Sequence, residues 1–249
     1  MNVRFARTVV SVAAVVVTAS CTHFYEIPIE TPIRPKLDVS GFQRVLVAGF
    51  ISGGTDDVDG NVETTRLLRS QLRTKSDLRV IDADTLPLVD VATRRDPSAA
   101  ATPAPAIREA KDLVTYEPVF ANVAYWKDIG EEYQQPLIVT GTVLFIPQEQ
   151  SRPVIRNEEE YDNFGRRTTR TVRSYQELKG FKLSLNVIFI DGRTGAVIHS
   201  IRPEESNSYP SNQQTPALSA YFELMDRIVP SFLGTLSSQR VKGTRFLLQ

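Results

Sequence analysis

Residues 44–51 read Arg-Val-Leu-Val-Ala-Gly-Phe-Ile, and this apolar run decides the fold. A continuous apolar run of this length predicts a buried β-strand. The residues after it predict a helix from about Asn61 to Lys75 and a second strand from Leu78 to Asp82. A strand, a helix and a strand in this order favour parallel pairing of the two strands.

Further along the chain, three more strands are expected. Leu137 to Ile146 is strongly apolar and is followed by Pro147, which we expect to end the strand. Phe181 to Ile190 alternates apolar and polar residues, as a strand with one more buried face does. The residues Asp191-Gly-Arg-Thr-Gly195 predict a hairpin turn, after which residues 196–201 return as the partner strand.

Two helices are expected to cover this sheet. Residues 118–134 place Trp126 on an apolar stripe, so that Trp126 belongs to the core. Residues 218–236 form a wide apolar face that must lie across the sheet. Residues 245–248 add a final short strand. The predicted fold class is α/β (α+β), a mixed β-sheet with helices packed on it and a protruding β-hairpin.

The N-terminus has the pattern of a secretory signal peptide over residues 1–20, because Arg4 and Arg7 precede an uncharged stretch too short to span a bilayer. Small residues lead into Cys21, the single cysteine of the chain. This pattern resembles the bacterial lipobox, in which the cysteine receives the lipid, although Thr18 stands where leucine is usual. The alternative is ordinary cleavage that leaves Cys21 as a free thiol, an unfavourable arrangement in an oxidising compartment.

Two segments follow the signal peptide. Residues 21–41 form a proline-bearing tether whose aromatic and isoleucine side chains are expected to pack on the domain or on a neighbouring subunit. Residues 42–249 are expected to form one domain, with a mobile loop at about residues 90–110 and a polar hairpin at residues 148–180. The chain of 249 residues carries 29 basic and 29 acidic side chains, which gives no general attraction to nucleic acid.

Metal and cofactor sites are not predicted. His23 and His199 are the two histidines, and with Cys21 lipidated no zinc-binding spacing remains. An EF-hand loop through Asp57 and Asp59 would need a glutamate where Arg66 stands, so calcium binding in that mode fails. We expect no metal and no cofactor.

Catalytic motifs are also missing from the sequence. Gly49, Gly53 and Gly54 precede a helix but fit neither phosphate-binding fingerprint, and we expect them to be turn residues. Ser52 does not sit in a nucleophile elbow. The sequence therefore predicts a protein that is not an enzyme. An arginine stripe on the first helix, formed by Arg66, Arg69 and Arg73, is either a docking site for an acidic partner or a solvated helix face.

The polar segment 148–180 gives the strongest functional signal. Three glutamates, residues 158–160, precede a turn-like Asn-Phe-Gly at residues 163–165, and arginines follow it. Folding the segment at this turn sets acid opposite base, which predicts a hairpin with charged cross-strand pairs. The segment is either a docking arm or a solvated loop. The candidate partner-binding residues are Glu158, Glu160, Phe164, Arg166, Arg167 and Arg170.

A family resemblance joins these features. The lipobox-like cysteine, the tether and the runs at residues 44–50, 136–143 and 187–200 resemble the CsgG-like superfamily of curli secretion lipoproteins. The penicillin-binding-protein activator LpoB and the N-terminal domain of TolB have a similar layout. The resemblance implies a mixed sheet with helices packed on it, and bacterial envelope proteins that work by assembly and contact.

Three functions compete. A secretion-channel subunit of the CsgG type would need membrane-spanning hairpins, and the hairpin here is highly charged. An activator of a peptidoglycan synthase, as LpoB is, would need a longer tether. The third is a membrane-anchored adaptor or assembly subunit with envelope protein partners and possible homo-oligomers, which we favour. Thr22 after the lipidated cysteine implies the outer membrane, with the periplasmic side of the inner membrane as the alternative.

Overall fold

The computed structural model describes residues 24–93, 106–161 and 164–248, and Cys21 lies outside these residues. The chain falls into two compact units. The larger unit, Pro35–Ser237, holds a six-stranded sheet, and the smaller unit comprises residues up to Arg34 and from Ser238 onward. The predicted single domain of residues 42–249 thus differs from the structure at its end, because residues from 238 onward cluster with the N-terminal segment.

The sheet of the larger unit is mixed. Its strands are β2 (Arg44–Gly54), β3 (Arg79–Val80), β4 (Leu137–Tyr161), β5 (Arg167–Asp191), β6 (Val197–Ile201) and β7 (Glu204–Pro210). Their order is β3-β2-β4-β5-β6, and β7 also pairs with β5. β2 runs parallel to β3 and β4, whereas β4, β6 and β7 are all antiparallel to β5. The predicted mixed sheet, its opening parallel pair and the turn into β6 are confirmed.

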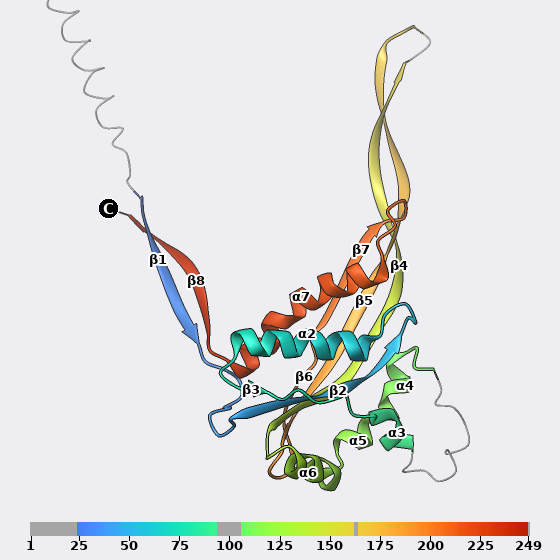
Figure 1. Cartoon of the computed structure of the whole chain (residues 1–249). Coiled ribbons are helices and arrows are strands. Elements are labelled where there is room, and N and C mark those ends of the chain that lie inside the picture. The colour runs from blue at the N-terminus through green and yellow to red at the C-terminus, as the bar shows by residue number, and fades with distance from the viewer. Residues whose placement is uncertain (1–23, 94–105, 162–163, 249) are drawn as a thin grey trace, which may run out of the picture. The chain divides into compact units, whose positions relative to one another are not determined.

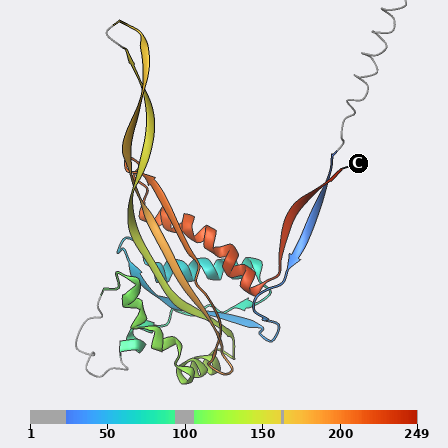
Figure 2. The same cartoon turned by 180° about the vertical axis from the view of Figure 1, so that it is seen from behind.

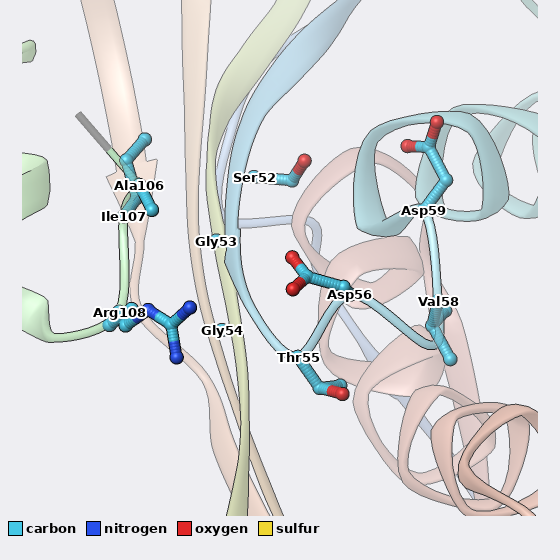
Figure 3. A pocket seen from close by; sticks show the side chains of 10 residues that line it. All are labelled: Ser52, Gly53, Gly54, Thr55, Asp56, Val58, Asp59, Ala106, Ile107 and Arg108. Carbon is cyan, nitrogen blue, oxygen red and sulfur yellow. The ribbon is translucent and has the colours of Figure 1, made fainter. Parts of the chain in front are cut away.

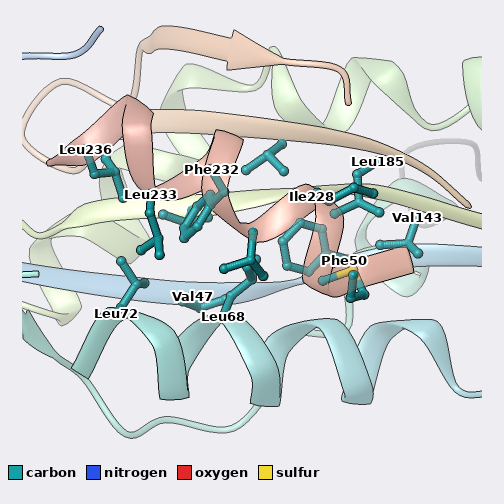
Figure 4. Close-up of a cluster of buried hydrophobic side chains, with 14 of the residues drawn as sticks. Val47, Phe50, Leu68, Leu72, Val143, Leu185, Ile228, Phe232, Leu233 and Leu236 are labelled. Carbon is teal, nitrogen blue, oxygen red and sulfur yellow. The ribbon is translucent and has the colours of Figure 1, made fainter. Parts of the chain in front are cut away.

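Two long helices cover one face of this sheet (Figures 1 and 2). Helix α2 (Gly60–Lys75) begins where the side chain of Asp59 accepts a hydrogen bond from the N–H of Val62, at 3.0 Å. Helix α7 (Ala217–Leu236) buries ten residues along one stripe. Figure 4 shows side chains of both helices packed together with those of β2, β4 and β5. Both helices were predicted from the sequence and are confirmed.

Four short helices cover the opposite face: α3 (Leu88–Thr93), α4 (Ala110–Val114), α5 (Glu117–Phe120) and α6 (Val123–Glu132). Trp126 is fully buried there, as predicted, and its indole N–H donates to the carbonyl of Val119 at 2.9 Å. The single helix predicted over residues 118–134 is wrong. It is two helices, because the side chain of Asn122 caps the start of α6 by accepting from the N–H of Tyr125.

The segment predicted as a mobile loop, residues 90–110, lies partly outside the described residues. Its first residues, up to Thr93, belong to α3, and its last residue, Ala110, begins α4. Those two ends of the predicted loop are therefore helical.

The smaller unit is a two-stranded ribbon. β1 (Phe24–Ile33) pairs antiparallel with β8 (Gln239–Leu248) over ten residue pairs. Residues 24–33 of the predicted tether are therefore a strand that pairs with the C-terminal strand. The short strand predicted at residues 245–248 belongs to this longer β8.

β4 and β5 are each 25 residues long, far beyond the usual strand length. The prediction that Pro147 ends a strand is wrong, since β4 continues through it to Tyr161. β5 likewise begins at Arg167 rather than at the predicted Phe181. Both strands leave the sheet as one continuous, twisted hairpin, which confirms the predicted protruding hairpin (Figure 1).

Candidate protein-binding arm

We define the arm as residues 148–180, the part of the β4–β5 hairpin that extends from the sheet. β2 pairs with β4 only as far as Phe145, and β7 pairs with β5 only as far as Leu178. Beyond these points the described arm is a ribbon of two strands. At about 3.4 Å per residue, its strands reach about 45 Å from the sheet.

The register of the arm is uninterrupted from the sheet to the tip. Leu137 faces Asp191 at one end and Tyr161 faces Arg167 at the other, with no shift between them. The predicted turn, residues 163–165, lies between the last residue of β4, Tyr161, and the first residue of β5, Arg167, and residue 163 lies outside the described residues. Gly165 has a φ of +72°, a left-handed conformation that glycine adopts without strain.

The charged candidate residues lie along both strands near the tip. Glu158 faces Arg170 and Glu160 faces Thr168. Among the described residues near the tip, Glu159, which is not a candidate residue, forms an ion pair with Arg167 and accepts from its Nε at 2.8 Å. These side chains are solvent-exposed, and exposed ion pairs contribute only about 0–1 kcal/mol each to stability. The charges therefore do little to hold the arm together.

Phe164 occupies the tip of the arm and is 84% exposed. The guanidinium carbon of Arg166 lies 5.4 Å from the centre of the Phe164 ring, within cation–π range. The structure thus brings two of the candidate residues together in a small aromatic and cationic group at the tip.

Three further exposed apolar side chains on the arm were missed by the sequence analysis. Ile155, Tyr161 and Tyr175 are 66%, 68% and 76% exposed. All three lie on one face of the ribbon, because residues of equal parity share a face of a strand pair in this register. Their spacing along the chain is a signal that could have located them, because it places them on one face of a strand pair. The overall polarity of the segment does not reveal it.

A pocket of about 340 Å³ lies at the end of β2 (Figure 3). Residues 106–108 line one side of it, and Asp56, Val58 and Asp59 line the other. The predicted turn role of Gly53 and Gly54 is corrected here, because both are the last residues of β2. A side chain at Gly53 would overlap Ile107, so glycine lets residues 106–108 pack directly on the strand.

Two polar residues that line this pocket, Asp59 and Thr55, are engaged within the chain. Asp59 caps α2, and the Thr55 hydroxyl donates to Asp57 at 2.9 Å. In the described chain, no group of three or more histidine, cysteine, aspartate or glutamate side chains is arranged to hold a metal ion. The pocket presents no assembled set of nucleophile and base, so we assign it no chemistry.

The arginine stripe of α2 is also largely committed to contacts within the chain. Arg69 donates to the carbonyl of Val47 at 2.8 Å, and burial lowers the pKa of its guanidinium. Arg73 forms an ion pair with Asp82. Arg66 and Arg73 are exposed, whereas Arg69 is half-buried. These contacts favour the solvated-face interpretation over a docking site.

Within the described residues, no helix has the length and apolar character needed to cross a membrane.

Comparisons with known proteins leave the family open. No protein-family model and no curated protein sequence matches the chain. Among solved structures, the chain is similar to a putative neuraminyllactose-binding hemagglutinin homolog from Helicobacter pylori, with 14% identity, a TM-score of 0.37, and coverage of 88% of this chain and 92% of that chain.

Two further solved structures are also similar. Lipoprotein GNA1162 from Neisseria meningitidis has 15% identity and a TM-score of 0.34, with 78% of this chain and 99% of that chain covered. The LpoB C-terminal domain from Salmonella enterica has 9% identity and a TM-score of 0.26, with 70% of this chain and 84% of that chain covered. At such scores, the function must be argued from the chain's own residues.

Proposed function

We propose that this chain is a non-enzymatic envelope lipoprotein that binds a protein partner through the arm and acts as an adaptor or assembly subunit. Cys21 carries the lipid, and the anchor holds the protein at the outer membrane with its domain in the periplasm. The arm supplies the contact surface. The proposal assigns no catalytic role to any residue.

The observation that carries the proposal is the exposure of large apolar side chains on the arm. A two-stranded ribbon on its own is marginally stable in water, so a long one gains from a partner that covers it. Exposed apolar groups that cluster amid polar residues mark interaction surfaces. Ile155 and Tyr175 are diagonal neighbours across the two strands, Tyr161 and Phe164 lie nearer the tip, and the charges around these exposed side chains would orient the partner.

The test is a triple charge reversal near the tip, Arg166→Glu, Arg167→Glu and Arg170→Glu. The full chain is purified with its partners from its native cells in mild detergent, and the bound proteins are identified by mass spectrometry. We expect the reversal to remove the partner at low salt. The difference from wild type should shrink at high salt, where charge attraction is already screened.

A matched control reverses three exposed basic residues away from the arm, Arg66→Glu, Lys75→Glu and Arg79→Glu, and changes the net charge by the same amount. This control should retain the partner. Retention of every bound protein by the arm variant, or equal loss from both variants, would contradict the proposal. Ion conductance of the purified chain in planar bilayers would favour the channel alternative instead.

A further inference from the structure

The backbone of the arm has a fixed pattern of inward and outward hydrogen-bonding groups. In an antiparallel pair, alternate residues point both N–H and C=O away from the partner strand. On β4 the carbonyl of Phe145 points outward, because it accepts from the N–H of Thr55 at 2.9 Å. On β5 the N–H of Phe181 and the carbonyl of Glu177 also point outward, to Asn207 and Ser211. The unbroken register then makes every odd-numbered residue of the arm strands an outward one.

The two edges of the arm differ in what they offer. On the β4 edge, the outward position Pro153 has no N–H to donate, and neither has the outward Pro147 just before the arm. The β5 edge has no proline. Beyond the last pair with β7, the outward N–H and C=O groups of β5 have no backbone partner among the described residues. These groups belong to Arg167, Thr169, Thr171, Arg173 and Tyr175.

Side chains along the β5 edge suit an added strand of opposite charge. Arg170 and Arg173 make no ion pair in the described chain, and both are exposed. Arg173 shares a face with Arg167 and Tyr175, and the opposite face carries the half-buried Val172. Threonine and valine between the arginines favour the extended conformation. Bare edges are commonly protected by charge or proline, and here the proline protection is confined to β4.

We propose that the β5 edge of the arm, residues 167–175, receives an extended acidic segment of the partner protein as an added β-strand. The inference rests on the proposed function and names the partner's chemistry and binding mode. Main-chain hydrogen bonds supply the docking, and alternate acidic side chains of the segment lie on the face of Arg173. Apolar residues between them lie on the face of Val172.

The test compares two proline substitutions at one cross-strand pair. Thr171 and Asn157 face each other, and the Thr171 hydroxyl donates to Oδ1 of Asn157 at 3.1 Å. Thr171→Pro and Asn157→Pro each remove that side-chain hydrogen bond and one outward N–H. The N–H lost in Thr171→Pro belongs to the β5 edge, and the N–H lost in Asn157→Pro belongs to the β4 edge. Proline is tolerated at such outward positions, as Pro153 shows.

The probe is a fluorescent peptide of about ten residues, a usual strand length, that alternates glutamate with valine. Binding to the purified full chain is followed by fluorescence anisotropy, with a lysine-for-glutamate peptide as the charge control. We expect Thr171→Pro to weaken binding about tenfold, because a donor is lost and the ring obstructs the incoming strand. Asn157→Pro should bind as wild type does, and the lysine peptide should not bind.

Amide hydrogen exchange measured by NMR gives a second readout. In the free protein, odd-numbered amides from Arg167 to Tyr175 should exchange quickly and even-numbered amides slowly. The peptide should protect the odd-numbered amides. Absence of this protection, or equal weakening by both proline variants, would overturn the inference. It would also be overturned if Thr171→Pro dissolved a self-association of the chain and left peptide binding unchanged, since a second copy would then occupy the edge.

The two proposals fail in different ways. If the triple arginine reversal releases the native partner while Thr171→Pro leaves both partner and peptide bound, the arm is the binding site and strand addition is wrong. If neither change affects the native partner, the arm itself is not the binding site, and both proposals fall.

Discussion

The same two strands form the centre of the sheet and the arm, and their two halves share one register but differ in what covers them. Phe189 of β5 is fully buried under α7, whereas Tyr175 of the same strand and the same face is 76% exposed. The hydrogen-bonded register is identical in both halves. Pairing of backbone groups therefore sets the shape of the hairpin. Burial of apolar side chains means that the half in the sheet contributes more to the stability of the fold than the arm does.

The largest expected effect is the difference in stability loss between matching alanine substitutions in the two halves. Phe189→Ala should lower the free energy of unfolding by about 3–5 kcal/mol, because it leaves a cavity in the core. The lost ring stacks against Phe232 of α7 at 6.0 Å between centroids. Tyr175→Ala should change the free energy by less than about 0.5 kcal/mol. Urea denaturation of both variants measures the difference, and similar losses in the two would contradict it.

A smaller effect concerns charge in the two halves. At the sheet end of β5, the Asp191 carboxylate accepts from the backbone N–H of Arg193 at 2.8 Å and from its guanidinium. The side-chain hydrogen bond to Arg193 lowers the pKa of Asp191 in the folded protein. A carboxyl whose folded pKa is depressed adds stability above its unfolded pKa of about 4 and loses it as the pH falls through the folded value.

Asp191→Asn should therefore cost about 1 kcal/mol at neutral pH, and the gap from wild type should narrow as the pH falls below about 4. In the arm, Glu159→Gln removes the exposed pair with Arg167 and should cost less than about 0.5 kcal/mol at any pH. Urea denaturation of both variants from pH 7 to pH 3 measures these gaps. A gap for Asp191→Asn that widens in acid would show that this carboxylate is not stabilising.

Much of the fold could be predicted because burial leaves a strong pattern in the sequence. The apolar run at residues 44–51 and the apolar stripe of α7 match the strand and the helix that the structure contains. Pro147 misled the prediction, because proline ends a strand only where its N–H is needed. Pro147 sits at an outward position of β4, beyond the last pair with β2, so nothing is lost there.

The smaller unit was harder to predict for a different reason. The partners β1 and β8 are about two hundred residues apart in the chain, and neither strand's sequence indicates which segment it pairs with. The candidate arm was partly predictable, since the charge pattern and the glycine turn located the hairpin and its tip. Which edge of the arm lacks a backbone partner depends on where β7 ends and on whether Pro147 and Pro153 fall at outward positions. Neither can be known before the register is fixed.

Removal of the arm is the largest change in sequence, and we expect it to have only a small effect on stability. Residues 151–177 are replaced by Asn-Gly, so that Gln150 and Leu178, which face each other at an inward position, close a two-residue hairpin. This cut keeps every residue pair between β5 and β7. The free energy of unfolding should stay within about 1 kcal/mol of wild type. The arm buries little apolar surface, and the shorter connection lowers the entropy cost of closing the hairpin. Calorimetry and urea denaturation measure the stability, and the same preparation should no longer capture the partner. A loss of several kcal/mol would mean that the arm contributes to the core, and the contrast between the two halves of β4 and β5 would then be wrong.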